Sequence, residues 1–133
     1  MPDAVTDTHA LIWYLQGDSR LSPTASAYFD GCQTDNGRIR VPSICAVEIV
    51  YLSEKGRIRP DALEVLLEQF AAPDTILQLV PLDLTVVMGL RNVPRSEVPD
   101  LPDRIIAATA SALGLPLITR DGRIQASRVT TVW

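Results

Sequence analysis

The stretch LPDRIIAATASALGLPLITRD, residues 101–121, decides the fold class of this chain. Its run of small and branched apolar residues is typical of a helix with a buried face, and Gly114 is the expected end of that helix. The segment that follows is short and apolar, as expected for a buried strand, and it stops at the acidic Asp121. We therefore predict a helix over residues 103–114 and a strand over residues 115–121.

The same alternation of strand-like and helix-like segments continues towards both ends of the chain. Strands are expected at residues 3–7, 38–43, 75–82 and 128–133. Helices are expected at residues 8–16, 24–33, 44–56, 61–72 and 85–93, with a Pro-rich loop at 94–102 and a helical turn at 122–127. Strands that alternate with helices are typical of βα units and a parallel sheet. The sequence predicts an α/β fold.

Several helix boundaries carry recognisable signals. Ser22 before Pro23 predicts a helix start, with the serine as N-cap and the proline in the first helical position. Ser43 is the expected cap of the helix that follows the second strand. Gly17 and Gly56 are expected stops, because glycine readily adopts the left-handed conformation that ends a helix.

Length and composition indicate one globular domain over residues 1–133, with 47% hydrophobic and 21% charged residues. No apolar run approaches the roughly 20 residues of a membrane span. The N-terminus has no basic start typical of a signal peptide, and Cys32 and Cys45 fit neither a zinc motif nor a disulfide framework. We expect a cytoplasmic protein without membrane association.

The net charge of −4 argues against a nonspecific nucleic-acid binder. The cations, however, are eleven arginines and a single lysine. Guanidinium groups bind phosphate oxygens in a bidentate manner, and carboxylates gathered at a metal site also make a chain acidic. The net charge therefore does not exclude a nucleic-acid substrate.

Four acidic residues stand out because their neighbours are apolar. Asp7 ends the first expected strand, and Asp121 ends another strand, at the sheet edge where α/β proteins bind ligands. Glu48 is the only charge in ICAVEIVYL, residues 44–52, and Asp103 lies at the top of a helix face that is expected to pack on the sheet.

Each of these four acids also has a purely structural interpretation. Asp7 could cap the following helix, and Glu48 could lie on a thin exposed strip. Asp103 could complement the dipole of a helix that Asp100 caps, and Asp121 could serve an Asp-Gly turn. These alternatives stay open for each residue taken singly.

Taken together, the four acids favour a metal centre. They follow or precede strands in positions that can converge on one sheet edge, where four carboxylates repel one another unless a cation lies among them. Oxygen ligands without a histidine or cysteine cluster select Mg²⁺ or Mn²⁺ over zinc. Such ions activate water for attack on phosphate esters, so the pattern indicates metal-dependent phosphodiester hydrolysis.

Three segments in this order resemble the PIN-domain family, specifically the VapC-type ribonuclease toxins of bacterial toxin–antitoxin pairs. They are TDTHALIWYL, VPSICAVEIVYLSEKGRI and LPDRIIAATASALGLPLITRD, and the resemblance extends over essentially the whole chain. It implies a three-layer α/β/α sandwich around a short central parallel sheet, RNA as substrate, Mg²⁺ or Mn²⁺ as cofactor, a homodimer, and a cognate VapB-like antitoxin that neutralises the enzyme.

The resemblance also implies a role for each acid. Asp7 and Asp103 would be the main metal ligands, Glu48 a ligand directly or through water, and Asp121 would complete the pocket. Thr119 matches a position where the family often has a small hydroxyl residue. Many relatives carry an Asp-Pro-Phe-Asp-Arg motif ahead of the last long helix, whereas this chain has VPDLPDR, which puts the shape of that loop in question.

Other polar and aromatic residues near the acids have competing interpretations. Arg104 is expected to pair with an acid or to hold a phosphate, and Arg120 and Arg123 are candidates for RNA backbone contact, with solvated surface as the alternative. His9 is expected to be structural or part of a dimer face, and Trp13 a core or dimer contact.

Two other functions fit the same acids. A phosphotransfer or receiver-like domain also places carboxylates at strand ends, but it normally needs a lysine beside them, and Lys55 lies one to two helical turns beyond Glu48. A catalytically weak PIN-like module would bind a partner without cutting RNA. Retention of all four acids argues against this second alternative.

Overall fold

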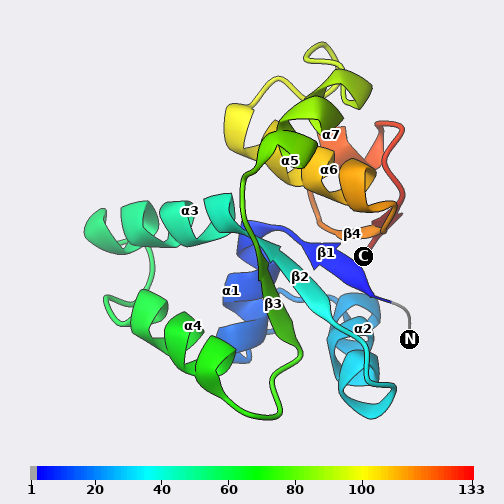
Figure 1. The fold of residues 1–133 in the computed structure, drawn as a ribbon. Coiled ribbons are helices and arrows are strands. Elements are labelled where there is room, and N and C mark those ends of the chain that lie inside the picture. The colour runs from blue at the N-terminus through cyan, green and yellow to red at the C-terminus, as the bar shows by residue number, and fades with distance from the viewer. Residues whose placement is uncertain (1–2) are drawn as a thin grey trace.

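The computed structural model describes residues 3–133, which contain one five-stranded sheet. Every neighbouring pair of strands is parallel, and the spatial order is β3-β2-β1-β4-β5 (Figure 1). The strands are β1 (Ala4–Thr6), β2 (Ile39–Pro42), β3 (Leu77–Val80), β4 (Leu117–Ile118) and β5 (Thr131–Val132). The predicted α/β class with a short parallel sheet is confirmed.

Helices cover both faces of the sheet. Figure 1 shows α1, α2 and α4 on one side and α5, α6 and α7 on the other, while α3 projects from the edge of the sheet and contacts α1, α4 and α6. The helices are α1 (Thr8–Gln16), α2 (Pro23–Thr34), α3 (Ser43–Glu54), α4 (Ala62–Ala71), α5 (Leu84–Gly89), the 3₁₀ helix η1 (Leu90–Asn92), α6 (Leu101–Leu113) and α7 (Gly122–Gln125). None of the helices in residues 3–133 is long and apolar enough to cross a membrane.

The central strands are buried because helices lie over both faces of the sheet. All residues of β1 and β4 are buried, as expected for parallel strands, whose sequences are apolar without alternation. Phe29, Leu11 and Ile106, from α2, α1 and α6, are among the largest fully buried side chains. Apolar packing on both faces therefore holds the strand ends in place.

The predicted strand over residues 115–121 is shorter in the structure, where β4 contains only Leu117–Ile118. After β4 the chain leaves the sheet and Asp121 caps α7. The predicted start of the preceding helix is also late. Asp100 is the N-cap, so α6 begins at Leu101, and Pro102 lies in the first turn, where it needs no backbone N–H partner.

The prediction that Ser43 caps α3 is wrong. Pro42 occupies the N-cap position without a side-chain bond, and Ser43 is the first helical residue. The Ser43 Oγ instead accepts a hydrogen bond of 3.1 Å from the backbone N–H of Leu82. This bond joins the start of α3 to the segment after β3, a long-range contact that capping rules do not anticipate.

Candidate active site

The site lies where the strand order reverses. β1 pairs with β2 on one side and with β4 on the other, and the connections leave these strands towards opposite faces. Such a switch point leaves a crevice at the carboxyl ends of the strands. Asp7 follows β1 directly, and its backbone N–H donates to the Ile118 carbonyl at 3.1 Å, which brings Thr119 beside it.

Asp7 is both a helix cap and a buried acid of this crevice. Its Oδ1 accepts a hydrogen bond of 2.9 Å from the backbone N–H of Ala10, so the capping interpretation is confirmed. Burial raises the pKa of Asp7, and hydrogen bonds from the Thr119 side chain and the Ala10 N–H oppose that rise. The sheet and α1 therefore hold in place a buried carboxyl group whose charged form is disfavoured by burial.

Asp103 lies in the first turn of α6. Its backbone N–H donates a hydrogen bond of 3.1 Å to the carboxylate of Asp100, the N-cap of this helix. Ile106, Ala107 and Ala110 below it are buried, as the predicted inward helix face requires. Burial raises the pKa of Asp103 to about 7, and the remaining causes are the negative charges of Asp100, Asp121, Glu48 and Asp7. All four predicted acids are thus close enough to interact electrostatically.

Glu48 projects from α3 and is half-buried. Its Oε1 accepts a hydrogen bond of 2.6 Å from the Thr8 hydroxyl, at the start of α1. The sequence alone allows Glu48 as a metal ligand or as part of a thin exposed strip, and in the structure its carboxylate accepts from a threonine.

Asp121 is the N-cap of α7, as its turn interpretation expects. Its Oδ1 accepts the backbone N–H groups of Arg123 and Ile124 at 2.9 and 3.0 Å. Its own N–H donates to the Thr119 Oγ1 at 3.0 Å. Thr119 is fully buried, and its side chain also forms a hydrogen bond with Asp7. Thr119 therefore connects Asp121 with Asp7, which supports its predicted place beside the site.

A pocket of about 230 Å³ opens between these elements. Asp7, Asp103 and Asp121 line it together with His9, Trp13 and Arg120. We call it the acidic pocket. Glu48 is not among the residues that line the acidic pocket. Its negative charge nevertheless contributes to the raised pKa of Asp103, which does line the pocket.

His9 is a wall of the acidic pocket, which its predicted structural or dimer-face role does not include. Its ring packs against Trp13 at a centroid distance of 5.8 Å. The position two residues after Asp7, in the first turn of α1, is the signal that could have placed His9 at the site.

Arg120 also lines the acidic pocket, and its guanidinium lies over the Trp13 ring at 4.6 Å from the centroid. A cation on an aromatic face is attracted to the ring, which favours this orientation of the guanidinium. Trp13 itself is buried and also contacts Trp133 edge-on at 5.9 Å, so the predicted core role of Trp13 is confirmed. Arg123 does not line the acidic pocket, although its backbone N–H donates a hydrogen bond to the Asp121 carboxylate.

Arg104 has a role that the sequence does not predict. Its Nε donates to the Val93 carbonyl at 2.8 Å and its Nη2 to the Leu90 carbonyl at 3.0 Å. These bonds, in place of the expected ion pair with an acid or contact with phosphate, attach η1 to α6. They hold the loop that leads to Asp103.

The donor chemistry of the site fits a hard divalent cation, because three acids line one pocket and supply only carboxylate oxygen. Within residues 3–133, however, no three His, Cys, Asp or Glu side chains are gathered as a ready-made set of metal ligands. Glu48 is bonded to Thr8 and Asp121 to the α7 backbone. The predicted ligand roles of the four acids stay predictions.

Comparisons with known proteins agree with this architecture. The family model described as PIN domain matches residues 4–129. Ribonuclease VapC22 of Mycobacterium tuberculosis is 30% identical over 138 aligned residues that cover all of both chains.

Solved structures share the fold at lower sequence identity. The crystal structure of VapBC2 from Rickettsia felis bound to promoter DNA aligns with a TM-score of 0.72 and 13% identity, covering 97% of this chain and 96% of that one. DNA-bound VapBC from Salmonella typhimurium aligns with a TM-score of 0.70 and 19% identity, covering 98% and 97%. The chain belongs to the PIN domain family, and within it to the VapC type.

Proposed function

We propose that this protein is a metal-dependent endoribonuclease that hydrolyses phosphodiester bonds in RNA and acts as the toxin of a toxin–antitoxin pair. The observation that carries the proposal is the acidic pocket at the switch point, where crowding contributes to an Asp103 pKa of about 7. The similarity to a protein named as a ribonuclease, over the full length of both chains, supports the choice of RNA as substrate.

Asp7 and Asp103 would be the principal ligands of Mg²⁺ or Mn²⁺, with Glu48 and Asp121 completing the site. When bound, such an ion would offset the negative charge of the phosphate and would lower the pKa of a water molecule, which would then supply a hydroxide nucleophile at neutral pH. A cation would also relieve the repulsion that raises the pKa of Asp103.

The chain's own residues orient the substrate and the acids. Arg120, whose guanidinium lies over Trp13 at the acidic pocket, would donate to phosphate oxygens there. Thr119 and the Ala10 N–H hold the Asp7 carboxylate, and Thr8 holds that of Glu48. Groups fixed before the substrate binds lose little entropy in the reaction, which is why such positioning favours catalysis.

The test compares two acids that cap helices in the same way. Asp7 caps α1 from within the pocket, whereas Asp83 caps α5 away from it, with its Oδ1 accepting the Val86 N–H at 3.2 Å. Asparagine is an equally good N-cap, so both Asp→Asn variants should fold. With Mg²⁺ or Mn²⁺ and RNA, Asp7→Asn should lose at least about 100-fold in kcat, as expected for removal of a principal electrostatic group, while Asp83→Asn should cleave normally. Full cleavage by Asp7→Asn would refute the mechanism.

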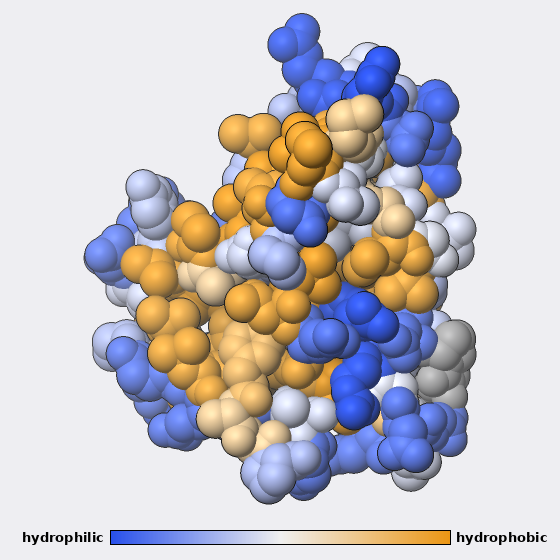
Figure 2. All heavy atoms as spheres, in the orientation of Figure 1, coloured by the Kyte–Doolittle hydropathy of each residue, from blue (hydrophilic) through white to orange (hydrophobic). Residues whose placement is uncertain are grey.

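We also propose that the protein forms a homodimer through an exposed apolar face. Figure 2 shows apolar surface over α3, the end of β3 and α5. Its exposed residues are Val47, Tyr51, Leu79, Leu82, Leu84, Val87 and Met88. Contiguous exposed apolar surface is typical of a protein–protein interface.

Light scattering tests the dimer. The expected mass is twice the 14.5 kDa of one chain. Leu84→Glu, at the most exposed of these side chains, should give monomers. Ala27→Glu, at an exposed position of α2, which is not one of the elements of this face, should leave the mass unchanged. A monomeric wild type would contradict the proposal.

A cognate antitoxin is the second proposed partner. The structural neighbours are VapBC and FitAB assemblies bound to DNA, and this supports a VapB-like partner for the present chain. The product of an adjacent small reading frame should co-purify with the chain and inhibit its cleavage of RNA. Cleavage that is unaffected by stoichiometric complex formation would contradict neutralisation.

The position of Lys55 disfavours a phosphotransfer function. Lys55 follows α3 and its ammonium lies over the Tyr51 ring at 6.0 Å, and it is not among the residues that line the acidic pocket. A catalytically weak binding module is the remaining alternative. That alternative would be supported if this protein bound RNA but did not cleave it in the presence of Mg²⁺ or Mn²⁺.

A further inference from the structure

We propose that a second pocket, rich in arginine and adjoining the acidic pocket, binds the phosphate backbone of the RNA beside the cleaved bond. This inference rests on the proposed ribonuclease function and adds the path of the substrate across the surface. The pocket has a volume of about 500 Å³, and Arg20, Arg57 and Arg59 line it. We call it the arginine pocket.

The two pockets share walls. His9 and Trp13 line the acidic pocket on one side and the arginine pocket on the other. Trp13 also orders a guanidinium on each side, since Arg120 lies 4.6 Å and Arg20 5.2 Å from its ring centroid. A strand that leaves the acidic pocket past His9 and Trp13 therefore meets the arginine pocket next.

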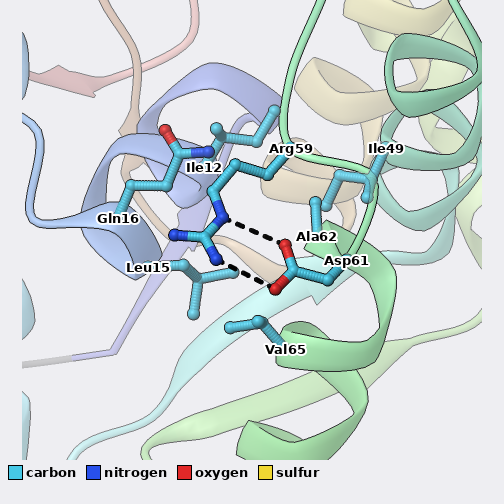
Figure 3. A pocket seen from close by; sticks show the side chains of 8 residues that line it. All are labelled: Ile12, Leu15, Gln16, Ile49, Arg59, Asp61, Ala62 and Val65. Carbon is cyan, nitrogen blue, oxygen red and sulfur yellow. Dashed lines mark hydrogen bonds and ion pairs between the residues drawn. The ribbon is translucent and has the colours of Figure 1, made fainter. Parts of the chain in front are cut away.

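The arginines come from two loops that are distant in sequence. Arg20 follows α1, whereas Arg57 and Arg59 follow α3. The packing of α1 against α3 brings these loops together. Arg59 also lines a smaller neighbouring pocket of about 170 Å³, shown in Figure 3, where its guanidinium lies between α1 and the start of α4.

Ion pairs hold two of these guanidinium groups and leave donors available. Arg20 binds Asp18 through Nε and Nη2, and Arg59 binds Asp61 through the same two atoms, as Figure 3 shows for Arg59. Across residues 3–133, neither Nη1 has a hydrogen-bond partner, and the side chain of Arg57 has none at all. The two aspartates do not line the arginine pocket.

This arrangement favours RNA over an acidic peptide. Either ligand would satisfy the arginines, but under the proposed function the cleaved RNA strand must pass through the acidic pocket, where a bound cation would offset the repulsion between the carboxylates and a phosphate. An RNA strand cleaved at the acidic pocket continues beyond it with one phosphate per nucleotide. Guanidinium groups ordered by an aromatic ring and by ion pairs suit recognition of such a backbone without reading its sequence.

The experiment measures binding separately from cleavage. In the Asp7→Asn background, with Mg²⁺ present, a fluorescent single-stranded RNA of mixed sequence is titrated at several salt concentrations. Arg57→Ala should weaken binding about 10-fold and reduce the slope of log K against log salt by about 0.7, the value for one phosphate contact on a single strand. Arg57→Lys should restore most of the slope because it keeps the charge.

Arg91→Ala is the matched control, since Arg91 is exposed like Arg57 but lines a different pocket, formed by α5, η1 and α6. It should leave both affinity and slope unchanged. With the active enzyme, Arg57→Ala should raise KM and preserve kcat, because Arg57 lies outside the acidic pocket.

The outcomes separate this inference from the proposed function. A wild-type protein that neither binds nor cleaves RNA would refute the ribonuclease function itself. Active enzyme whose Arg57 and Arg91 variants behave alike would refute only the arginine pocket. Loss of binding to a hexaglutamate peptide in Arg57→Ala, with RNA binding unchanged, would assign the pocket to an acidic protein partner and overturn the RNA subsite.

Discussion

The Thr8 hydroxyl donates a 2.6 Å hydrogen bond to the Glu48 carboxylate and thereby joins the start of α1 to the middle of α3. Thr8 is buried and directly follows Asp7, so one backbone turn carries an acid of the pocket and the partner of another acid. The Glu48 charge contributes to the raised pKa of Asp103, so Glu48 lies close enough to act on the site.

Thr8→Val tests this link. Valine has nearly the same shape but cannot donate, so the free energy of unfolding should fall by about 1 kcal/mol, and kcat should fall because Glu48 is no longer oriented. Urea denaturation and RNA cleavage measure the two effects. Thr8→Ser keeps the hydroxyl and should retain most of the activity. Equal kcat values for all three proteins would show that the bond has no role in the site.

The pKa of Asp103 predicts an unusual pH dependence in metal-free protein. Because its folded pKa of about 7 exceeds its unfolded value, the folded state binds the extra proton. This contribution to stability is complete below about pH 4 and is lost as the pH rises to about 7. Asp103→Asn should therefore be more stable than wild type at about pH 8, by about 1 kcal/mol after allowance for solvent screening.

Urea denaturation in EDTA at about pH 5 and pH 8 checks this prediction. The two proteins differ only at Asp103, so the difference between their unfolding free energies reports the contribution of this carboxyl group and not that of the other acids. A difference that does not change between these pH values would contradict the raised pKa.

Addition of Mg²⁺ or Mn²⁺ should stabilise the wild-type protein. At an ion concentration ten times Kd, the expected gain is about 1.4 kcal/mol, which corresponds to a rise of roughly 3–6 °C in Tm. Differential scanning calorimetry measures this rise, with potassium at equal ionic strength as the control. The rise should be much smaller in Asp103→Asn, and an equal rise in both proteins would exclude Asp103 as a ligand.

Gly89→Ala tests the packing that positions α6 and hence Asp103. A Cβ at Gly89 would lie 2.7 Å from the Ala108 carbonyl oxygen, which is backbone and cannot move aside easily. We expect a loss of about 1–3 kcal/mol in unfolding free energy. At Gly122 a Cβ would meet nothing within 4 Å, so Gly122→Ala should change stability by less than about 0.5 kcal/mol. Denaturant titration of both variants decides the point.

Local sequence signals predicted the elements better than their boundaries. The Asp100 cap and the Gly114 stop were both found from residue preferences, and Gly114 ends α6 in the left-handed conformation with φ of 65°. Ser43 has the preference of a cap, yet its hydroxyl binds Leu82 from a different segment. Long-range partners of this kind depend on which strands pair, and local preference contains no information about that.

The candidate site shows the same division. The apolar neighbours of the four acids identified them as unusual, and the structure brings three of them into one pocket. Sequence reasoning missed His9 as a pocket wall, and it could not assign Arg104 to the η1 carbonyls. Both roles depend on which side of a helix faces which loop.

The sequence by itself determined the α/β class, the order of the elements and the identity of the four acids, because these follow from residue preferences and from periodicity along a single segment. Only the tertiary structure decided that Thr8 binds Glu48, that Thr119 connects Asp7 with Asp121, and that Arg20 and Arg57 share a pocket. The strand order and the packing of α1 against α3 bring these groups together across tens of residues. Contact between such distant groups is a property of the folded chain, since no local preference encodes it.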